Sequence, residues 1–398
     1  MKIESLKILN YKALRKVEIE DVPAYAVFIG ANGSGKTTLF DVFGFLKDCL
    51  SGNVRTALQK RGGFKEVVSR GHETENIEIR IQFRMPIAEV ERLVTYVLII
   101  ENRQKKPVVA REILRYKRGR YGSPFHFLDF SYGKGFAIKN EEDFEKADEE
   151  LERENQELDS PDILAIKGLG QFSRFKAASA MRSLLENWHV SDFHINLARG
   201  EKDTEYAEHL SVSGDNLSAV SQYIYEQHPE IFDKILDAMK KRVPGIEDIK
   251  AEPLPNGKII LRFRDGSFKD PFIDRYVSDG TIKMFAYLVL LNDPQPHPLL
   301  CVEEPENQLY PHLMSQLAEE FLEYCNRRED GGQVFVSTHS PEFLNEVPIE
   351  SVFWLDKENG STQIHRASED ENLARLVAEG DKPGYLWKQG LLGRQIPA

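Results

Sequence analysis

The sequence has few cysteines and no apolar run long enough to cross a membrane. Its three cysteines, Cys49, Cys301 and Cys325, are an odd number without ligand spacing, which argues against disulfides and against structural zinc. The longest apolar run, around Met284–Leu291, is too short for a membrane span. The N-terminus lacks the apolar segment of a secretory signal. These absences predict a cytoplasmic protein with no membrane partner.

A strong positive charge and internal repeats are also absent. The 398 residues carry a net charge of −12, which argues against a protein that coats nucleic acid through charge alone. A local basic patch remains, because Arg103–Arg120 holds eight lysines and arginines against Glu112 alone. Glu141–Asp162 has the opposite bias, with twelve carboxylates, and is typical of a solvated helix or a flexible connector.

What the sequence does contain is a complete GxxxxGK[ST] motif, Gly30–Thr37. The apolar run Ala24–Ile29 before it is typical of a buried strand, and Thr38–Leu50 after it has the spacing of a helix. One face of that helix is expected to be buried, with Leu39, Val42, Phe43, Leu46 and Leu50. This strand–loop–helix context is the one in which the motif binds phosphate.

The chemistry of the motif follows from its residue types. Glycines let backbone N–H groups turn inward around phosphates, and the helix N-terminus adds positive potential. Lys36 is expected to reach the β- and γ-phosphates, and the Thr37 hydroxyl is expected to hold Mg²⁺. A glycine-rich turn that matches by chance is the alternative, which the flanking strand and helix disfavour.

The apolar patterns along the chain predict an α/β fold. Up to about residue 139 they predict a mainly antiparallel sheet, with segments at 3–8, 17–22, 77–85, 96–100 and 124–130. Helices are expected to dominate from about 172 to 241. Later strands alternate with helices, which indicates a parallel or mixed sheet. The strands are expected at 258–263, 299–302 and 333–336, and the helices at 281–292 and 312–326.

Two buried strands of this second half end in polar residues. Leu299–Val302 leads into Glu303 and Glu304, and carboxylates at such a place can organise Mg²⁺ and orient or deprotonate an attacking water. We expect Glu303 to serve the metal and Glu304 to be the base, with an exposed acidic turn as the alternative. Val334–Val336 leads into His339, whose imidazole can hydrogen-bond the γ-phosphate or the water.

A further anion site is expected at the start of the helix near residue 281. Ser278 and Gly280 there offer a hydroxyl and a backbone N–H group, as the phosphate loop does. The Ser-Asp-Gly sequence is equally typical of a turn and helix cap.

Together these segments resemble a known family. The set GANGSGKTT, VSDGT, LLCVEEPENQLYP and VSTHSPEFLN is similar to the ABC-type ATPase heads of the RecF/SMC-like branch. The resemblance is closest to RecF-like predicted ATPases and to the ATPase part of OLD-type proteins. Met1–Leu14 also resembles the start of that branch. The resemblance implies a P-loop fold with a mixed parallel core sheet, an antiparallel β subdomain and a helical lobe.

The resemblance also implies roles for individual residues. Glu303 would be the Walker B carboxylate that holds Mg²⁺ together with Thr37, Glu304 the catalytic base and His339 the switch histidine. Lys36 would both bind nucleotide and assist catalysis. The nucleotide-binding Walker A residues would be Gly30, Asn32, Gly33, Ser34, Gly35, Lys36, Thr37 and Thr38.

Other implied roles lie outside the Walker motifs. Ser278 and Gly280 would belong to the signature loop, which binds the nucleotide held by the opposite subunit, and Glu306–Leu309 would be the D-loop. Tyr11 and Lys12 would lie near the nucleotide. The Mg²⁺-sensing glutamine would be Gln171, which follows the strand-like segment 162–166; a solvated loop glutamine is an equally good interpretation.

Three features depart from the family pattern. Glu303 stands where most heads have aspartate, which can shift the water shell of Mg²⁺. Val277–Thr281 lacks the second glycine of the usual signature, which puts the strength of dimer closure in doubt. No coiled coil of SMC length joins the lobes, so long-range tethering of DNA is not expected.

The sequence therefore predicts an ATPase with ATP and Mg²⁺ as cofactors and an ATP-dependent homodimer as its active form. Adenine is implied by the resemblance, and the guanine-specific Asn-Lys-x-Asp tetrapeptide is absent. The N-terminal half of the head with its β subdomain is expected at 1–140 and an acidic connector with a helical insert at 141–269. The C-terminal half of the head is expected at 270–398.

The partner of such an ATPase stays open. The first hypothesis is DNA repair or DNA-structure sensing, with Arg103–Arg120 binding DNA and Tyr116 and Tyr121 stacking on bases. That patch is equally well explained as a sheet edge protected by charge.

The alternative function is a regulatory scaffold for a separate effector in a phage-defence or toxin–antitoxin-like module. Its support is that the residues after His339 show no nuclease-like acidic constellation. A transporter motor fits the signature loop less well. Tyr385–Gly393 is expected to pack on the head, with partner docking as the alternative.

Overall fold

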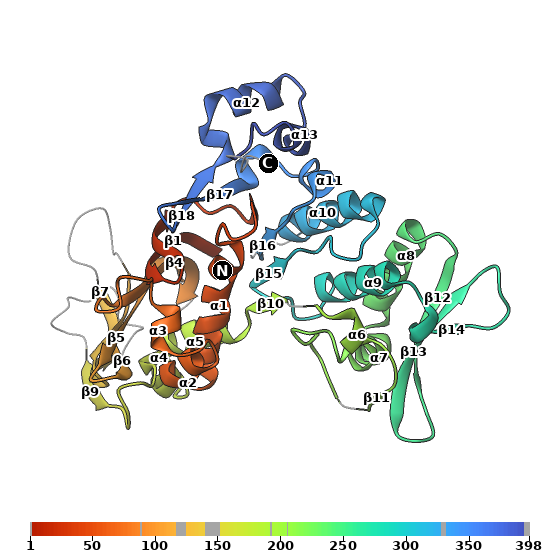
Figure 1. Cartoon of the computed structure of the whole chain (residues 1–398). Helices are drawn as coiled ribbons and strands as arrows, with labels where there is room; N and C mark the ends of the chain where they lie inside the picture. The colour runs from red at the N-terminus through yellow and green to blue at the C-terminus, as the bar shows by residue number, and fades with distance from the viewer. Residues whose placement is uncertain are drawn as a thin grey trace. The chain divides into compact units, whose positions relative to one another are not determined.

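A computed structural model describes residues 2–87, 90–116, 125–139, 152–191, 193–204, 206–327 and 332–393. The chain divides into two compact units (Figure 1). Unit 1 comprises residues 1–188, 350–370 and 393–398, and unit 2 comprises 189–349 and 371–392. The three segments expected from the sequence, divided at residues 140 and 269, stay a prediction. Within the described ranges, no helix is both long and apolar enough to span a membrane.

The larger part of unit 1 is an antiparallel sheet of eight strands, in the order β2-β1-β4-β5-β6-β7-β8-β9. Alternate residues of β4 are buried, from Ile77 to Met85, as the sequence pattern predicts. The strands are β1 (Lys2–Tyr11), β2 (Leu14–Ile19), β4 (Ile77–Ile87), β5 (Val90–Arg103), β6 (Lys106–Tyr116), β7 (Phe125–Ser131), β8 (Lys134–Ile138) and β9 (Arg153–Glu157). The expected antiparallel pair at the N-terminus is confirmed, because Leu6 pairs with Ile19 and Ile8 with Val17.

The rest of unit 1 carries the phosphate-loop motif. The fully buried strand β3 (Tyr25–Gly30) pairs in parallel with β17 (Val352–Glu358), which pairs antiparallel with β18 (Ser361–Arg366). Helix α1 (Lys36–Ser51) follows the loop and buries all five apolar residues that the sequence assigns to its inner face. Shorter helices complete the unit: α2 (Val54–Gln59), α3 (Phe64–Val67), α4 (Ala165–Leu169) and α5 (Lys176–Glu186).

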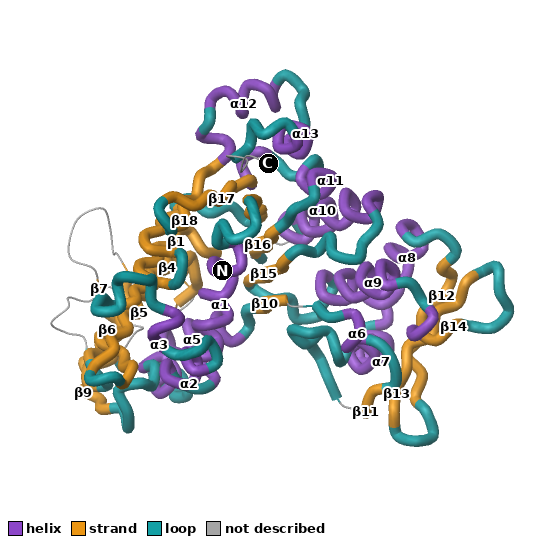
Figure 2. Tube along the Cα trace, viewed as in Figure 1, coloured by secondary structure: helices purple, strands orange, loops and turns teal. Residues whose placement is uncertain are grey.

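Unit 2 is built on three parallel strands, β10 (His189–Ser191), β15 (Leu299–Glu303) and β16 (Gln333–Ser337). Figure 2 shows its helices and its small sheet, in which β12 and β13 contact α7. The helices are α6 (Ile195–Ala198), α7 (Leu217–Gln227), α8 (Pro229–Arg242), α9 (Asp279–Leu291), α10 (Pro311–Asn326), α11 (Pro341–Leu344), α12 (Glu371–Ala378) and α13 (Pro383–Lys388). The small sheet contains β11 (Lys202–Asp203), β12 (Ile246–Pro253), β13 (Lys258–Asp265) and β14 (Phe272–Ile273).

Each unit thus combines strands and helices, and the mixed α/β class expected from the sequence is confirmed. One local expectation is wrong. The segment 162–166 is not a strand, because its first residues form a turn and helix α4 begins at Ala165. The buried carboxylate of Glu112 accepts hydrogen bonds from the N–H groups of Ala165 and Ile166. A carboxylate on β6 therefore caps the helix, which local sequence does not reveal.

Candidate functional site

The phosphate loop of unit 1 has backbone geometry that only glycine allows at two positions. Gly30 has φ +153°, and a Cβ there would lie 2.4 Å from the carbonyl oxygen of Leu355. Gly35 has φ +111°, and a Cβ there would lie 2.2 Å from Oγ1 of Thr362. Strands β17 and β18 therefore lie in close contact with the loop. Glycine is required at these positions both for the approach of the strands and for the turn.

Lys36 fills the concave side of this loop. Its Nζ donates to the carbonyl oxygens of Gly30 at 2.8 Å and Ala31 at 3.3 Å, and the residue is only 5% exposed. Among the described residues, no side chain caps the N-terminus of α1, so its first N–H groups suit an anion. The Thr37 side chain is exposed and available to a metal ion. The loop thus has the chemistry to bind phosphate groups.

Thr362 on β18 contacts the phosphate loop, and the sequence analysis missed it. It is fully buried, its backbone N–H donates to Ala13, and its Oγ1 donates to the Ser34 carbonyl at 2.8 Å. The hydroxyl therefore forms a hydrogen bond that links the phosphate loop to β18. It lies 328 residues from Ser34, so no local pattern could have identified it.

Tyr11 and Lys12 both contact Asp41, which lies on α1. The Tyr11 hydroxyl donates to Asp41 at 2.8 Å, and the ring is completely buried. Lys12 Nζ forms an ion pair with the same carboxylate at 2.5 Å, and Arg61 forms another at 2.6 Å. Burial, followed by the Asp41 charge, raises the pKa of the Tyr11 hydroxyl. These contacts tie β1 to α1, and a role near the nucleotide stays a prediction for both residues.

Gln171 lies in the exposed segment between α4 and α5. Its Nε2 donates to the carbonyl oxygen of Lys167 at 3.3 Å. This is the environment of a solvated loop glutamine, and the role of Gln171 as a Mg²⁺ ligand stays a prediction.

In unit 2, the carboxyl ends of β15 and β16 bring two predicted residues together. Glu303 is the last residue of β15 and pairs with Ser337. Glu304 has φ +43° and donates its N–H to the Ser337 carbonyl at 2.9 Å. This turn brings Glu304 Oε1 within 3.4 Å of His339 Nε2. An acid and an imidazole so placed could share a proton or orient one water molecule.

Neighbouring residues hold this pair in position. Asn307 Nδ2 donates to Glu304 Oε2 at 3.1 Å, and the Glu306 carboxylate accepts the backbone N–H of His339. Lys283 Nζ donates to the Asn307 carbonyl at 2.6 Å and links α9 to the expected D-loop. Burial lowers the pKa of Lys283 to about 8, and the charges of Glu306 and Glu304 oppose this shift. The sequence analysis missed Lys283 because the sequence of α9 is almost uniformly apolar.

The imidazole of His339 also has an aromatic neighbour. The Trp387 ring on α13 stacks beside it at 6.5 Å between centroids and 27° between planes. Lys388 pairs with Glu342 at 2.9 Å, and Leu386 is buried. The C-terminal segment therefore packs against unit 2, as the favoured sequence interpretation expected.

The expected signature loop is also the N-cap of α9. Ser278 Oγ accepts the N–H of Thr281 at 3.2 Å, so the helix-cap interpretation is confirmed. The residue is nevertheless exposed, and a nucleotide role stays a prediction. Gly280 is buried, and a Cβ there would lie 3.2 Å from the Gln308 carbonyl, which places this loop beside the expected D-loop.

Arg199 fixes the conformation of the segment before α9, and the sequence analysis missed it. Its guanidinium donates to the carbonyls of Asp274 and Arg275 at 3.0 Å each and of Val277 at 2.7 Å. It also forms an ion pair with the Asp279 carboxylate. One planar side chain with several donors thus holds the turn that presents Ser278.

The basic segment is only partly described, because 117–124, including Tyr121, lies outside the described residues. Tyr116 is buried against Phe125 and Phe127, so its expected role in stacking on bases is wrong. The edge-strand explanation is wrong for β6, which pairs with both β5 and β7. A pocket of about 380 Å³ has basic side chains in its lining, namely Arg55, Lys65, Lys105 and Lys106.

The described residues therefore form two centres, the phosphate loop in unit 1 and the Glu304–His339 pair in unit 2. The structure brings Lys36 together with its loop and Glu304 together with His339. That both centres act on one nucleotide stays a prediction.

Comparison of the sequence with known proteins gives a family match and a local match to one curated relative. Residues 26–345 match the family model described as "AAA domain, putative AbiEii toxin, Type IV TA system". A DNA replication and repair protein RecF from Phocaeicola vulgatus is 45% identical over 51 residues, which is 13% of this chain and 14% of that protein. The chain thus matches only a small part of this curated relative.

Solved structures show the same fold. An Smc head bound to the C-terminal winged-helix domain of ScpA has a TM-score of 0.55 at 14% identity, over 94% of this chain and all of that one. The Smc head of Pyrococcus furiosus, with an extended coiled coil and bound to the C-terminal domain of ScpA, has a TM-score of 0.54. It is 12% identical over 95% of this chain and 99% of that one. These matches agree with the resemblance to the heads of the RecF/SMC-like branch drawn from the sequence, and the Smc heads share the fold of this chain.

Proposed function

We propose a function from the premise that this chain belongs to the AAA-domain family whose description names AbiEii toxin and type IV TA systems. The chain binds ATP with Mg²⁺, hydrolyses it to ADP and phosphate, and uses the cycle to open and close a homodimer of heads. The observation that carries this proposal is the phosphate loop, with buried Lys36 turned into it and an uncapped helix behind it.

Nucleotide binding is tested with Lys36→Ala. Loss of the ammonium removes the cation that faces the β- and γ-phosphates, so ATP affinity is expected to fall by about 100-fold or more. Isothermal titration of ATP into both proteins measures this change. Lys60→Ala is the control, because Lys60 follows α2, its side chain is 62% exposed and its Nζ pairs with Asp48 at 2.5 Å. Unchanged ATP affinity in Lys36→Ala would show that this loop is not the ATP-binding site.

Hydrolysis is assigned to the second centre. Glu304 is the base, and His339 hydrogen-bonds the γ-phosphate or the attacking water, because the two side chains lie 3.4 Å apart. Glu304→Gln keeps the shape of the side chain but removes the base, so ATP should bind normally while kcat falls by about 100-fold or more. Phosphate release with wild-type kcat would contradict the assignment.

Dimerisation is supported by the surface around the expected signature loop. Two large aromatic side chains are exposed there, Tyr276 at 74% and Tyr310 at 60%. Gly280 adjoins the second of them, because a Cβ at this glycine would lie 3.6 Å from the Tyr310 ring. Exposed aromatic residues beside an anion-binding helix terminus suit a surface that closes over a partner's ATP. ATP favours the closed dimer through contacts that the open state lacks.

The family description names a type IV TA system, which is compatible with a separate protein effector as the partner of this cycle. The ATP-bound dimer would hold the effector, and hydrolysis would release it. The test purifies the Glu304→Gln protein in the presence of ATP and asks whether the product of an adjacent gene is purified with it. Capture by Glu304→Gln that is lost with Lys36→Ala supports this role, and equal capture by both proteins contradicts it.

DNA binding is the second candidate, because a matched relative is a DNA replication and repair protein and because Lys65, Lys105 and Lys106 lie around one pocket. A variant that makes two fewer contacts to DNA phosphates should bind DNA more weakly, and its affinity should depend less on the salt concentration. Fluorescence anisotropy with the double variant Lys105→Glu/Lys106→Glu tests this. Lys240→Glu/Lys241→Glu on α8 is the control with the same charge change. Equal DNA affinity in both variants would exclude this pocket as the DNA site.

A further inference from the structure

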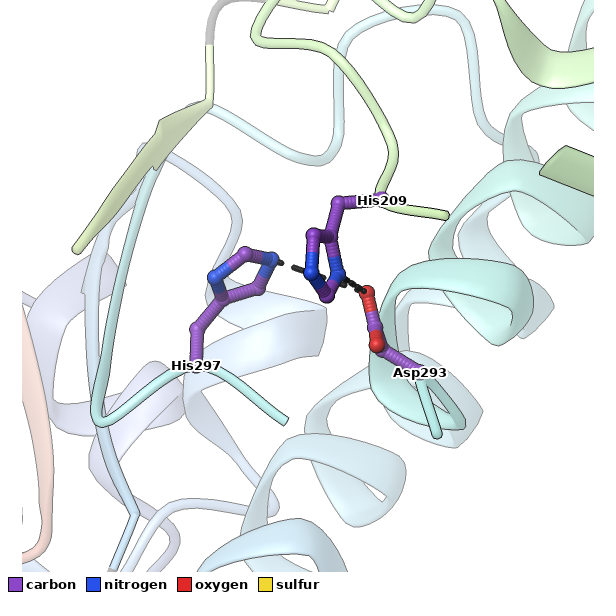
Figure 3. A group of neighbouring side chains, drawn as sticks. All are labelled: His209, Asp293 and His297. Atoms are coloured by element: carbon purple, nitrogen blue, oxygen red, sulfur yellow. Dashed lines mark hydrogen bonds and ion pairs between the residues drawn. The ribbon is translucent and has the colours of Figure 1, made fainter. Parts of the chain in front are cut away.

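Unit 2 contains a group of metal-ligating side chains that belongs to neither centre described above. His209, Asp293 and His297 each direct one ligand atom into a common space, and these atoms all lie within 4.8 Å of one another (Figure 3). His209 Nδ1 lies 2.9 Å from Asp293 Oδ2, and His297 Nε2 lies 3.8 Å from the same oxygen. The group uses two of the chain's ten histidines.

The three side chains come from three different segments. His209 lies in the loop before α7, Asp293 follows the C-cap of α9, and His297 precedes β15. His209 and Asp293 are 84 residues apart. The sequence expectation against structural zinc rested on the cysteines alone, and this separation explains why the histidines gave no spacing signal.

Backbone contacts fix each of these residues. Asp293 Oδ1 accepts the Gln295 N–H at 2.8 Å, which turns Oδ2 toward the two imidazoles. The His209 carbonyl accepts from Asn216 at 3.0 Å, and the His297 carbonyl accepts from the Tyr324 hydroxyl at 2.9 Å. These hydrogen bonds hold the backbone at His209 and His297 and the carboxylate of Asp293, which reduces the conformational entropy lost on binding an ion.

The burial of the Asp293 carboxylate makes a positive charge beside it favourable. The side chain of Asp293 is 2% exposed, that of His297 is 10% exposed, and that of His209 is 38% exposed. A buried carboxylate whose nearest polar neighbours are two imidazoles and one backbone N–H group has lost most of its hydration. A divalent cation would supply that charge, and the partly exposed His209 gives it a path of entry.

We propose that His209, Asp293 and His297 bind a divalent transition-metal ion, with Zn²⁺ as the best match. Two imidazole nitrogens and one carboxylate oxygen are ligands that Zn²⁺ accepts, at bond lengths of about 2.0–2.2 Å. Atoms at such distances from one ion in a tetrahedral site are separated by roughly 3.4 Å, which lies between the 2.9 Å and 3.8 Å given above, and all three ligand atoms lie within 4.8 Å of one another. The open side of His209 leaves room for water as a fourth ligand.

The position of the site indicates a structural role. The ion joins the C-terminal end of α9 to the loop that enters β15 and to the loop before α7. Helix α9 has 13 residues and is therefore about 20 Å long, so the ion lies about that far from Ser278 at its other end. The ion would stabilise unit 2 without contacting a nucleotide, so the proposal is independent of the proposed function.

The test uses the full chain without a histidine tag, stripped of metal with a chelator. Zn²⁺ is titrated calorimetrically at pH 7.5, and Co²⁺ is added separately so that its visible d–d bands report the coordination geometry. His209→Ala is the main variant, because His209 is the most exposed ligand and its loss is least disruptive to folding. His72→Ala is the matched control, since His72 is also 38% exposed and pairs with Glu75 at 2.6 Å.

The proposal predicts a single saturable Zn²⁺ site in the wild type and in His72→Ala, with a rise in melting temperature of a few degrees at saturation. His209→Ala should bind Zn²⁺ at least about 100-fold more weakly and lose that rise. Circular dichroism checks that the variant is folded, and Asp293→Asn provides a second loss of ligand. A wild type without saturable binding, or equal Zn²⁺ affinity in His209→Ala, would overturn the proposal.

Discussion

The hydrogen bond from Thr362 to the phosphate loop makes a sharp test of how the fold supports nucleotide binding. Thr362→Val replaces the hydroxyl with a methyl group and keeps the side-chain shape. The variant loses the 2.8 Å bond to the Ser34 carbonyl and leaves that carbonyl without this donor in a buried place. Ala13 still accepts the backbone N–H of residue 362, so β18 keeps its position.

The size of the effect follows from the burial of this bond. Leaving a buried acceptor unsatisfied costs about 1–3 kcal/mol, and 1.4 kcal/mol corresponds to a tenfold change in an equilibrium constant. Part of the cost acts on the free protein, so we expect the dissociation constant for ATP to rise roughly 3- to 10-fold. The melting temperature should fall by about 2–4 °C.

Calorimetric titration of ATP, together with thermal unfolding, measures both quantities. Thr362→Ser keeps the donor and should bind ATP nearly as well as the wild type. Thr95→Val is the matched control, because Thr95 is a buried threonine on β5 that accepts from Gln82 at 3.4 Å. The Thr95→Val variant should be less stable than the wild type but should bind ATP with the same affinity. Equal ATP affinity in Thr362→Val and Thr362→Ser would refute the reasoning.

Three further predictions concern contacts between distant segments of the chain. Burial raises the pKa of Glu112 from 4.5 to about 7, so its contribution to stability is complete below pH 4.5 and is lost as the pH rises through 7. Urea unfolding should show a loss on the order of 3 kcal/mol between pH 4.5 and 8, which Glu112→Gln abolishes; an unchanged pH dependence would contradict it. Arg199→Met should free the turn before α9 and prevent ATP-dependent dimerisation while ATP still binds, and a normal dimer on light scattering would show this to be wrong. Trp387→Ala should lower kcat about tenfold with little change in KM, because the ring positions His339, and wild-type kcat would exclude that role.

Much of the fold could be predicted where the signal is local. The strand, loop and helix around Gly30–Thr37 depend on a run of apolar residues, a glycine pattern and a helical spacing that lie next to one another in the chain. Glu304 and His339 could each be selected because each follows a buried apolar run, and the parallel pairing of β15 with β16 in the structure brings the two side chains together. Both inferences needed only residues within single elements.

The rest depends on contacts between distant segments. Helix α4 looked like a strand because its apolar run is short, and the Glu112 carboxylate that caps it lies about fifty residues away. Thr362, Arg199 and Lys283 have no motif of their own, because their importance comes from the backbone atoms they hold. Tyr116 looked like a binding residue because its neighbours in the sequence are basic. Strand alternation instead places its side chain inside an aromatic cluster.

The central claim is that ATP bound at the phosphate loop of one chain closes a second copy over it, and that Glu304 ends this state. Light scattering of Glu304→Gln during size exclusion, with ATP and Mg²⁺ and then with ADP, tests it most directly. The account predicts twice the monomer mass with ATP and the monomer mass with ADP, and monomer under both conditions for Glu304→Gln combined with Lys36→Ala. A monomer for Glu304→Gln with saturating ATP would contradict the account.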